Sequence, residues 1–258
     1  MTGFTLATDL DGTFLGGTDA ERDALYTWIE DHRASMTLIF VTGRDLAFIE
    51  DACAEGTMPW PDHVVGDVGT TIAKRDPESG RLLPDAKLEA PIAKLWGDGI
   101  GSLGATLDAA PGIAPQRGPF RHRMSYHYEP ESFDPETVSA IEAEGFDCLI
   151  SDNRFLDVLP RGISKGPSLL NLLAALGTPS SHVLVAGDTL NDLSLFETGL
   201  KGVAVGNSEA ALVERIKDRR NVYFAMGHGA AGVFEAIGAH GFLATIEQGV
   251  EKEKETLS

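Results

Sequence analysis

The stretch Phe4-Thr5-Leu6-Ala7-Thr8-Asp9-Leu10-Asp11-Gly12-Thr13 begins the chain with an apolar run that reads as a buried strand. Because successive strand residues point to opposite faces, Asp9 and Asp11 share one face at the strand's carboxyl end, where open α/β sheets bind ligands. Mg²⁺ takes oxygen ligands, commonly one or two carboxylates with a substrate phosphate, and this pair meets that need. The same residues also make a good tight turn, so the motif alone leaves a structural interpretation open.

Two further apolar strands end in polar motifs. The strand Thr37–Val41 runs into Thr42-Gly43-Arg44, and a helix is expected to begin near Asp45. A hydroxyl beside exposed helix amides can hold a phosphate group. The strand Val183–Ala186 runs into Gly187-Asp188-Thr189-Leu190-Asn191-Asp192, which brings two more carboxylates to a strand end. The sequence therefore predicts a cluster of four carboxylates beside a hydroxyl.

One lysine lies between these motifs. Ile163-Ser164-Lys165-Gly166-Pro167 leads into an amphipathic helix expected at Ser168–Leu176. A lone lysine before a helix is usually solvated. Close to four carboxylates, however, Lys165 would offset negative charge.

The four motifs, in this order and each near a strand end, resemble those of the haloacid dehalogenase superfamily of phosphatases. The resemblance spans Asp9 to Asp192, which is most of the chain. It implies an α/β fold with a Rossmann-like, doubly wound, mainly parallel sheet as the core and an inserted smaller α/β cap domain. It also implies Mg²⁺ as the cofactor.

Further segments resemble the sucrose-phosphatase group within that superfamily. They are Ser125-Tyr126-His127-Tyr128 after Arg123, Asp157-Val158-Leu159-Pro160-Arg161-Gly162, Leu195-Phe196-Glu197-Thr198, and Gly229 to Ile237. This likeness runs from about Phe4 to Phe242 and implies a small-molecule sugar phosphate as substrate. The same group includes or neighbours phosphatases of mannosylfructose phosphate and glucosylglycerol phosphate, and the sequence does not separate these substrates.

Hydrolysis of a phosphate monoester requires positioning, charge neutralisation and a good nucleophile. The resemblance implies that Asp9 attacks phosphorus to form an aspartyl phosphate, and that Asp11 acts as the acid and base. The backbone carbonyl of Asp11 would also ligate the metal. The predicted residues are Asp9 and Asp11 for catalysis; Thr42, Gly43, Lys165 and Asn191 for phosphate; Asp9, Asp11, Asp188 and Asp192 for the metal; and Arg123, Ser125, Tyr126, His127 and Asp157 for substrate in the cap.

Two residues keep two interpretations each. Arg44 either serves the phosphate or pairs with an acidic neighbour such as Asp45 or Glu50. Asp67, in Val64-Val65-Gly66-Asp67-Val68-Gly69, follows a strand and either belongs to a structural turn or touches the phosphate-bearing sugar.

The spacing between Thr42 and Lys165 exceeds one strand-helix unit, so we expect the cap between two core segments. The expected ranges are 1–81 and 160–258 for the core and 82–159 for the cap. Cap helices are predicted at 91–98, 104–110 and 135–144, and strands at 121–128, 146–151 and 155–159, with a hairpin turn at Asp152-Asn153. The segment Glu251–Glu255 is expected to fray.

Alternation along the strand expected at 121–128 sends Arg123, Ser125 and His127 to one face and Tyr126 to the other. Guanidinium, hydroxyl and imidazole groups suit hydrogen bonds to sugar hydroxyls, and the alternative is an exposed polar sheet face. His127 has no second His or Cys at a spacing useful for a metal. Asp157 either binds a sugar hydroxyl or closes the hinge into Pro160.

The composition excludes several classes of partner. With 21 Lys and Arg against 39 Asp and Glu, the net charge of −18 argues against nucleic acid and anionic membranes. No apolar run reaches about 18 residues and no leader pattern opens the chain, so a cytoplasmic protein is expected. A sugar-phosphate synthase of the same pathway is an expected partner.

Three functions remain open from the sequence. The first is a Mg²⁺-dependent phosphatase of a phosphorylated disaccharide or related glycosyl phosphate, such as sucrose 6-phosphate or mannosylfructose phosphate. The second is a broad-specificity phosphatase of small sugar phosphates, and the third is a catalytically silent binding protein with the same fold. A kinase is disfavoured because the sequence has no Gly-x-x-x-x-Gly-Lys-Ser/Thr loop.

Overall fold

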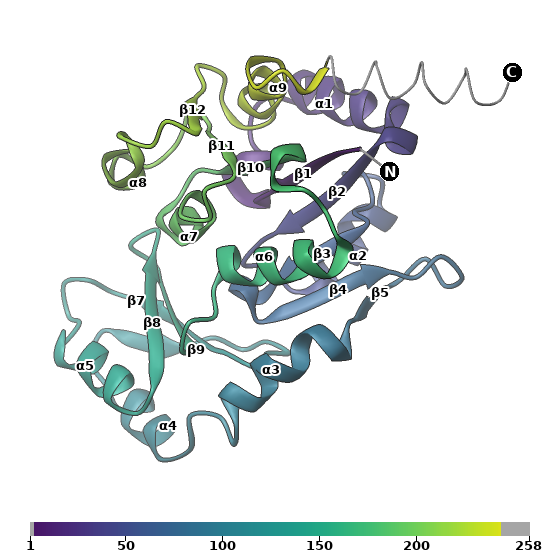
Figure 1. The fold of residues 1–258 in the computed structure, drawn as a ribbon. Coiled ribbons are helices and arrows are strands. Elements are labelled where there is room, and N and C mark those ends of the chain that lie inside the picture. Colours follow the sequence, from purple (N-terminus) through teal and green to yellow (C-terminus); the bar gives the residue numbers. More distant parts are fainter. Residues whose placement is uncertain (1–2, 244–258) are drawn as a thin grey trace, which may run out of the picture.

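The computed structural model describes residues 3–243, which fold around two β-sheets (Figure 1). The segment Glu251–Glu255 and the outer ends of the two expected core ranges lie outside the described residues. The larger sheet contains β1 (Phe4–Thr8), β2 (Met36–Val41), β3 (His63–Gly66), β4 (Thr71–Arg75), β5 (Leu82–Pro84), β10 (Val183–Gly187), β11 (Lys201–Ala204) and β12 (Val222–Phe224). The smaller sheet contains β6 (Ile113–Pro115), β7 (Met124–Tyr128), β8 (Phe146–Ser151) and β9 (Phe155–Pro160).

The larger sheet is mainly parallel and doubly wound. Its order is β12-β11-β10-β1-β2-β3-β4-β5, and only the β3–β4 and β4–β5 pairs among those described are antiparallel. From β1 the chain winds outward through β2 and β3 on one side, and later through β10, β11 and β12 on the other. The switch in winding direction lies at β1 and β10, which is where open α/β sheets bind ligands. The predicted Rossmann-like fold class is confirmed.

Helices cover both faces of the larger sheet (Figure 1). One face packs against α1 (Asp19–Asp31), α2 (Leu46–Ala54) and α9 (Gly229–Ala239), and the other against α3 (Ala86–Trp96), α6 (Lys165–Leu176) and α7 (Leu193–Phe196). Alternate residues of β1 enter opposite layers, because Leu6 packs with the first group of helices and Ala7 with the second. Burial on both faces explains why these strands are continuously apolar.

The smaller sheet is antiparallel, with the order β6-β7-β9-β8. One face packs against α4 (Gly101–Asp108), α5 (Glu136–Ala143) and the end of α3, in a core that includes Leu107, Ile141 and Tyr126. This unit lies at the carboxyl-end side of the larger sheet, as a separate small layer (Figure 1). The remaining helix, α8 (Ala210–Ile216), packs beside β11 and β12.

Several predicted boundaries differ from the structure. The helix expected at 91–98 begins five residues earlier, because the Asp85 side chain caps α3 by accepting hydrogen bonds from Lys87 N and Leu88 N. The helix expected at 104–110 is α4, which ends at Asp108, and the strand expected at 121–128 is β7, which begins at Met124. The short strand β6 was not predicted. The hairpin turn at Asp152-Asn153 is confirmed, since both residues have positive φ between β8 and β9.

The strand β5 hydrogen-bonds to β4 in the larger sheet, although it follows the expected boundary at residue 81. The expected division into 1–81, 82–159 and 160–258 stays a prediction. In the part of the chain that the structure describes, no helix combines the length and apolarity needed to cross a membrane.

Candidate active site

The predicted site residues of the core meet at the carboxyl ends of β1, β2 and β10. Asp9 follows β1, Thr42 follows β2, and Asp188 follows β10. The strands are neighbours and run parallel, so residues that follow them lie along one edge of the sheet. The Asp9 amide donates to Ala186 O at 2.9 Å, which extends the pairing of β1 and β10 into the site.

Lys165 is the centre of the site. Its ammonium group is fully buried and donates to Asp9 Oδ1 at 2.7 Å, Asn191 Oδ1 at 2.7 Å and Asp192 Oδ1 at 2.6 Å. Three donors therefore meet three oxygen acceptors, which satisfies the buried cation. Burial by itself lowers the pKa of Lys165, but the carboxylates of Asp192 and Asp9 together raise it. The lysine stays charged, contrary to the solvated alternative.

Three buried carboxylates gather beside this lysine. Ligand atoms of Asp9, Asp188 and Asp192 all lie within 4.8 Å of one another. Burial raises the pKa of Asp9 well above its ordinary value, with Lys165 opposing the shift. Burial and the Asp192 carboxylate raise the pKa of Asp188 to about 7. One lysine does not balance the charge of three ionised carboxylates, and a set of hard oxygen donors with that excess fits a divalent cation such as Mg²⁺.

Gly12 brings the loop after β1 close to Asp188. The residue has φ of +78°, and a side-chain Cβ there would lie 2.2 Å from Asp188 Oδ2. The next residue, Thr13, donates from Oγ1 to Asp188 Oδ1 at 2.8 Å. Gly12 is therefore required twice, by its backbone conformation and by the space that the Asp188 carboxylate occupies.

Asn207 holds the same loop from the other side, and the sequence analysis missed it. Its Nδ2 donates to Gly12 O at 2.9 Å, and its Oδ1 accepts from Gly229 N at 2.8 Å. One sequence signal could have revealed it. Asn207 follows β11, which lies next to β10 in the sheet, so it is a polar residue shortly after a strand, as the predicted site residues are. The side chain ties the Asp9–Thr13 loop to the start of α9.

Asp192 shapes its own loop. Its Oδ2 accepts from the Asp188 amide at 2.9 Å and from the Thr189 amide at 3.1 Å, while its other oxygen accepts from Lys165. A carboxylate that receives both backbone amides and a lysine is fixed in one orientation.

Asp11 points away from this buried cluster and pairs with Arg44. The guanidinium donates from Nε to Asp11 Oδ2 at 2.8 Å and from Nη2 to Oδ1 at 2.7 Å, and it lies over the Phe48 ring. Of the two interpretations left open for Arg44, the structure shows the pairing with a carboxylate, but the partner is Asp11 and not Asp45 or Glu50. Asp45 instead accepts from Phe48 N as the cap of α2, and Glu50 pairs with Arg81.

The turn at residues 42–44 follows β2 as predicted. Thr42 is fully buried, and its Oγ1 accepts from the Arg44 amide at 3.1 Å. Gly43 is half-buried in this turn, and the phosphate contact predicted for it stays a prediction.

In the smaller unit, Arg123 and Asp157 form a buried ion pair. Arg123 Nη1 donates to Asp157 Oδ1 at 3.1 Å, and Ser125 Oγ donates to the same oxygen. Arg123 also lies 3.2 Å from Asp67 Oδ1, an ion-pair contact without hydrogen-bond geometry, while Asp67 Oδ2 accepts from Thr71 at 2.6 Å. Burial raises the pKa of both Asp67 and Asp157, and Arg123 opposes each shift.

The neighbouring cap residues divide between the two faces of β7, as alternation predicts. Tyr126 is fully buried in the core of the smaller unit, and among the described residues its hydroxyl has no hydrogen-bond partner. Burial raises the pKa of Tyr126 to about 12. Its predicted contact with a substrate gains no support from this position. His127, by contrast, is exposed and lies near the Phe155 ring.

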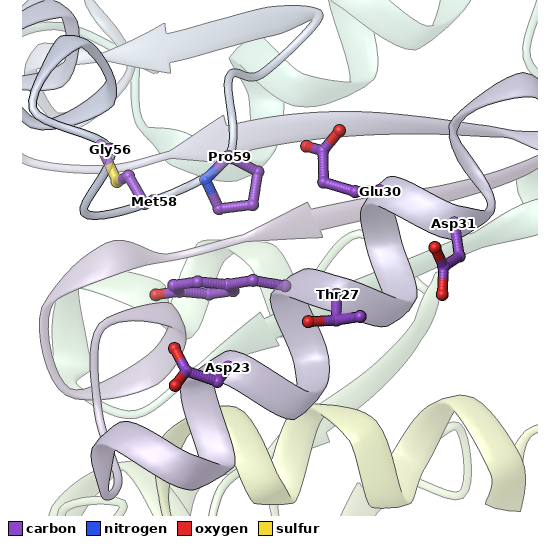
Figure 2. A pocket seen from close by; sticks show the side chains of 8 residues that line it. Asp23, Thr27, Glu30, Asp31, Gly56, Met58 and Pro59 are labelled. Carbon is purple, nitrogen blue, oxygen red and sulfur yellow. The ribbon is translucent and has the colours of Figure 1, made fainter.

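A surface pocket of about 540 Å³ lies elsewhere, between α1 and the loop after α2 (Figure 2). Asp23, Glu30 and Asp31 from α1 and Met58 and Pro59 from the loop line it. None of the predicted site residues borders it, and its lining holds no cation to meet a phosphate. The cluster around Lys165 remains the candidate active site.

Comparison with known proteins agrees with this geometry. The family model of sucrose-6F-phosphate phosphohydrolase matches residues 3–241. The chain belongs to this family. It is therefore a member of a family of phosphoric monoester hydrolases with the haloacid dehalogenase fold.

Three proteins from the comparison are similar over most of the chain. Mannosylfructose-phosphate phosphatase from Agrobacterium fabrum is 30% identical, over 90% of this chain and 94% of its own length. A glucosylglycerol-phosphate synthase from Pseudomonas anguilliseptica is 38% identical over 96% of this chain, which spans only 32% of that relative's length. The crystal structure of sucrose-phosphatase from Synechocystis sp. PCC6803, in complex with sucrose and phosphate, has a TM-score of 0.81 and 26% identity, covering 93% of this chain and 98% of that one.

Proposed function

We propose that this protein is a Mg²⁺-dependent phosphatase of a phosphorylated disaccharide or related glycosyl phosphate. The observation that carries the proposal is the buried Lys165, which contacts Asp9, Asn191 and Asp192 at the carboxyl end of the sheet. A purely structural site would not need to bury a cation among carboxylates that remain under-neutralised. The family membership and the names of two relatives, a mannosylfructose-phosphate phosphatase and a sucrose-phosphatase, support the same reaction.

The reaction begins with Asp9 as the nucleophile. Its carboxylate oxygen forms a bond to phosphorus while the ester bond to the sugar oxygen breaks, and the Asp11 carboxyl gives that oxygen a proton. Water then attacks phosphorus, Asp11 takes a proton from it, and the bond between Asp9 and phosphorus breaks. Lys165, by releasing one of its three present acceptors, and the Thr42 hydroxyl would hold the nonbridging oxygens, whose charge grows in the transition state.

The pairing of Asp11 with Arg44 bears on this step. The Arg44 guanidinium occupies both oxygens of the Asp11 carboxylate, so neither oxygen is free to meet the sugar oxygen. We infer that the pair opens when substrate binds, which frees Asp11 to act as the acid. Until then, the pair keeps the Asp11 side chain apart from the Asp9–Asp188–Asp192 cluster.

The proposed metal ligands are Asp9, Asp188 and the backbone carbonyl of Asp11, with Asp192 ligating through water or orienting the others. A bound Mg²⁺ would neutralise negative charge on the phosphate. Asn191 would help to orient the Lys165 ammonium group, which donates to its Oδ1. Thr13 fixes the Asp188 carboxylate for the same purpose.

The sugar part of the substrate is assigned to the smaller unit. Ser125, His127 and Asp157 lie on one face of its sheet by alternation and pairing, opposite to the face that carries Tyr126. His127 is the exposed member of this set. A sugar-phosphate synthase would supply the substrate, and one relative of this chain carries that name. A cytoplasmic location is part of the same proposal.

The experiment is a panel of phosphate-release assays. We would compare sucrose 6-phosphate, mannosylfructose phosphate, glucosylglycerol phosphate, trehalose phosphate and hexose phosphates, with and without Mg²⁺, using Asp9→Asn as the blank. A strong preference for one glycosyl phosphate supports the proposal. Equal activity over the panel favours a broad phosphatase of small sugar phosphates, and no release above the blank favours a silent binding protein.

A further inference from the structure

Arg123 reaches from the smaller unit to the turn at residues 42–44. Its side chain is about 8% exposed, and Nη2 donates to the Gly43 carbonyl at 3.0 Å. Nη1 donates to Asp157, and Asp67 lies opposite at 3.2 Å. The guanidinium is thus fixed by two carboxylates and a carbonyl, and it lies 4.5 Å from the centre of the Phe120 ring.

The three backbone carbonyls of the turn at residues 42–44 each accept a hydrogen bond. Two of the donors are backbone amides, and the third is a side chain. Thr42 O accepts from Val68 N at 3.0 Å, and Arg44 O accepts from Asp67 N at 3.0 Å. Both donors are backbone amides from a neighbouring loop of the same sheet. Gly43 O instead accepts from Arg123, a side chain 80 residues away in the sequence.

This carbonyl belongs to the peptide that orients the Thr42 hydroxyl. Gly43 C=O and Arg44 N–H form one planar unit, so fixing the oxygen also fixes the direction of the amide. That amide donates to Thr42 Oγ1 at 3.1 Å. A hydroxyl has one proton to donate, and with its oxygen already accepting from Arg44, the proton is available to a phosphate oxygen.

We propose that Arg123 is a positioning residue that sets the Thr42 hydroxyl through the Gly43–Arg44 peptide, so that phosphate binding depends on the docked smaller unit. This inference rests on the proposed function of Thr42. It differs from the predicted role of Arg123 as a ligand of the sugar, because here the guanidinium acts on every phosphate, whatever the sugar.

Asp67 supports the arrangement from the core. Its backbone amide donates to Arg44 O, and its side chain faces Arg123. Asp67 therefore contacts both the turn at residues 42–44 and the arginine that binds this turn. It adopts φ of +52°, a left-handed conformation that Asp and Asn tolerate better than other non-glycine residues. Strained backbone of this kind is kept where the surrounding contacts require it.

The test measures phosphate affinity and turnover separately. We would determine the Kd of inorganic phosphate in the presence of Mg²⁺ by calorimetry. We would also determine kcat and KM for sucrose 6-phosphate and for acetyl phosphate, which has no sugar. For Arg123→Ala we expect phosphate binding and both kcat/KM values to fall by a similar factor, about 10–100-fold. Arg123→Lys restores little, since an ammonium cannot bridge the same three acceptors.

Arg121→Ala is the matched control. Arg121 also links the smaller unit to the core, donating to Glu89 at 2.8 and 2.6 Å and to Thr71 at 3.1 Å, but it does not contact the turn. We expect this variant to lower the Tm while phosphate affinity changes by less than about threefold. If Arg123→Ala fails to fold, Asp67→Asn tests the proposal instead. Asn tolerates the same backbone conformation as Asp but lacks the charge that faces Arg123. For this variant we expect phosphate affinity to fall by less than the factor given for Arg123→Ala.

Four results would overturn the proposal, and two of them are patterns of loss among the variants. One is a loss confined to sucrose 6-phosphate, with acetyl phosphate and inorganic phosphate unaffected, because that pattern identifies a direct sugar ligand. The other is an equal loss of phosphate affinity in Arg121→Ala and Arg123→Ala. An active wild type with an unchanged Arg123→Ala overturns this inference alone, whereas a wild type that neither binds nor releases phosphate overturns the proposed function and this inference with it.

Discussion

Replacing Lys165 with Met removes the buried cation while keeping a side chain of similar length. In the wild type the ammonium contacts Asp9 and Asp192 at 2.7 and 2.6 Å, and no part of it is exposed. Removing one partner of a buried ion pair leaves an uncompensated charge and costs about 3–5 kcal/mol in folding free energy. For a chain of this size we expect the Tm to fall by about 6–12 °C, taking 3 kcal/mol and about 2–4 °C per kcal/mol.

The same substitution should reduce turnover. Loss of one donor to transition-state oxygens costs about 10²–10³ in kcat, and Lys165→Met removes that donor. We would measure urea unfolding and phosphate release from sucrose 6-phosphate for the variant and for Lys217→Met, a control at an exposed lysine paired with Glu214. Surface pairs contribute about 0–1 kcal/mol, so the control should resemble the wild type. An unfolding free energy within about 1 kcal/mol of the wild type, with activity within about tenfold, would refute the reasoning.

Gly12→Ala should reduce kcat/KM by about 100-fold and raise the Mg²⁺ concentration for half-activity, because the new Cβ meets Asp188 at 2.2 Å; Gly177→Ala, also at positive φ but with nothing within 4 Å, should stay active in the same assay. Asn207→Ala should lower kcat by about tenfold with KM nearly unchanged, because the Gly12 carbonyl loses its donor, and steady-state kinetics would show it. Chelation with EDTA should abolish phosphate release and Mg²⁺ should restore it, while activity that survives chelation would count against the metal. Tyr126→Phe should stabilise the fold by about 1 kcal/mol in urea unfolding, because the hydroxyl is buried without a partner among the described residues, and destabilisation would show that it has one.

The parts of the fold that follow from local sequence were predicted well. The apolar runs before Asp9, Thr42 and Asp188 are parallel strands β1, β2 and β10, because a continuous apolar run is the pattern of a strand buried on both faces. Since the polar residues follow those strands directly, their meeting at one edge also follows from the sequence. Element boundaries in the smaller unit were less accurate. The capping of α3 by Asp85 is a local signal that the sequence analysis missed, whereas the short strand β6 depends on its pairing with β7.

The pairings between distant side chains could not be predicted. Arg44 has acidic neighbours in the sequence, yet it pairs with Asp11, 33 residues away, because the ends of β1 and β2 are adjacent in space. Arg123 was predicted on the correct face, but its contact with Gly43 depends on how the two sheets dock. Asn207 carries no charge and no strong local motif. Its place shortly after β11 is a weak signal, and its contact with Gly12 is seen only in the structure.

The proposed mechanism requires that Asp9 becomes phosphorylated during turnover of a sugar phosphate. We would mix the protein with sucrose 6-phosphate and Mg²⁺, quench with acid within the first turnovers, digest it, and measure the peptide that contains Asp9 by mass spectrometry. We predict one phosphoryl group on Asp9 in the wild type. In Asp9→Asn we predict neither this phosphoryl group nor phosphate release. Release of phosphate by Asp9→Asn at the wild-type rate, or a phosphoryl group on another residue, would contradict the proposed role of Asp9.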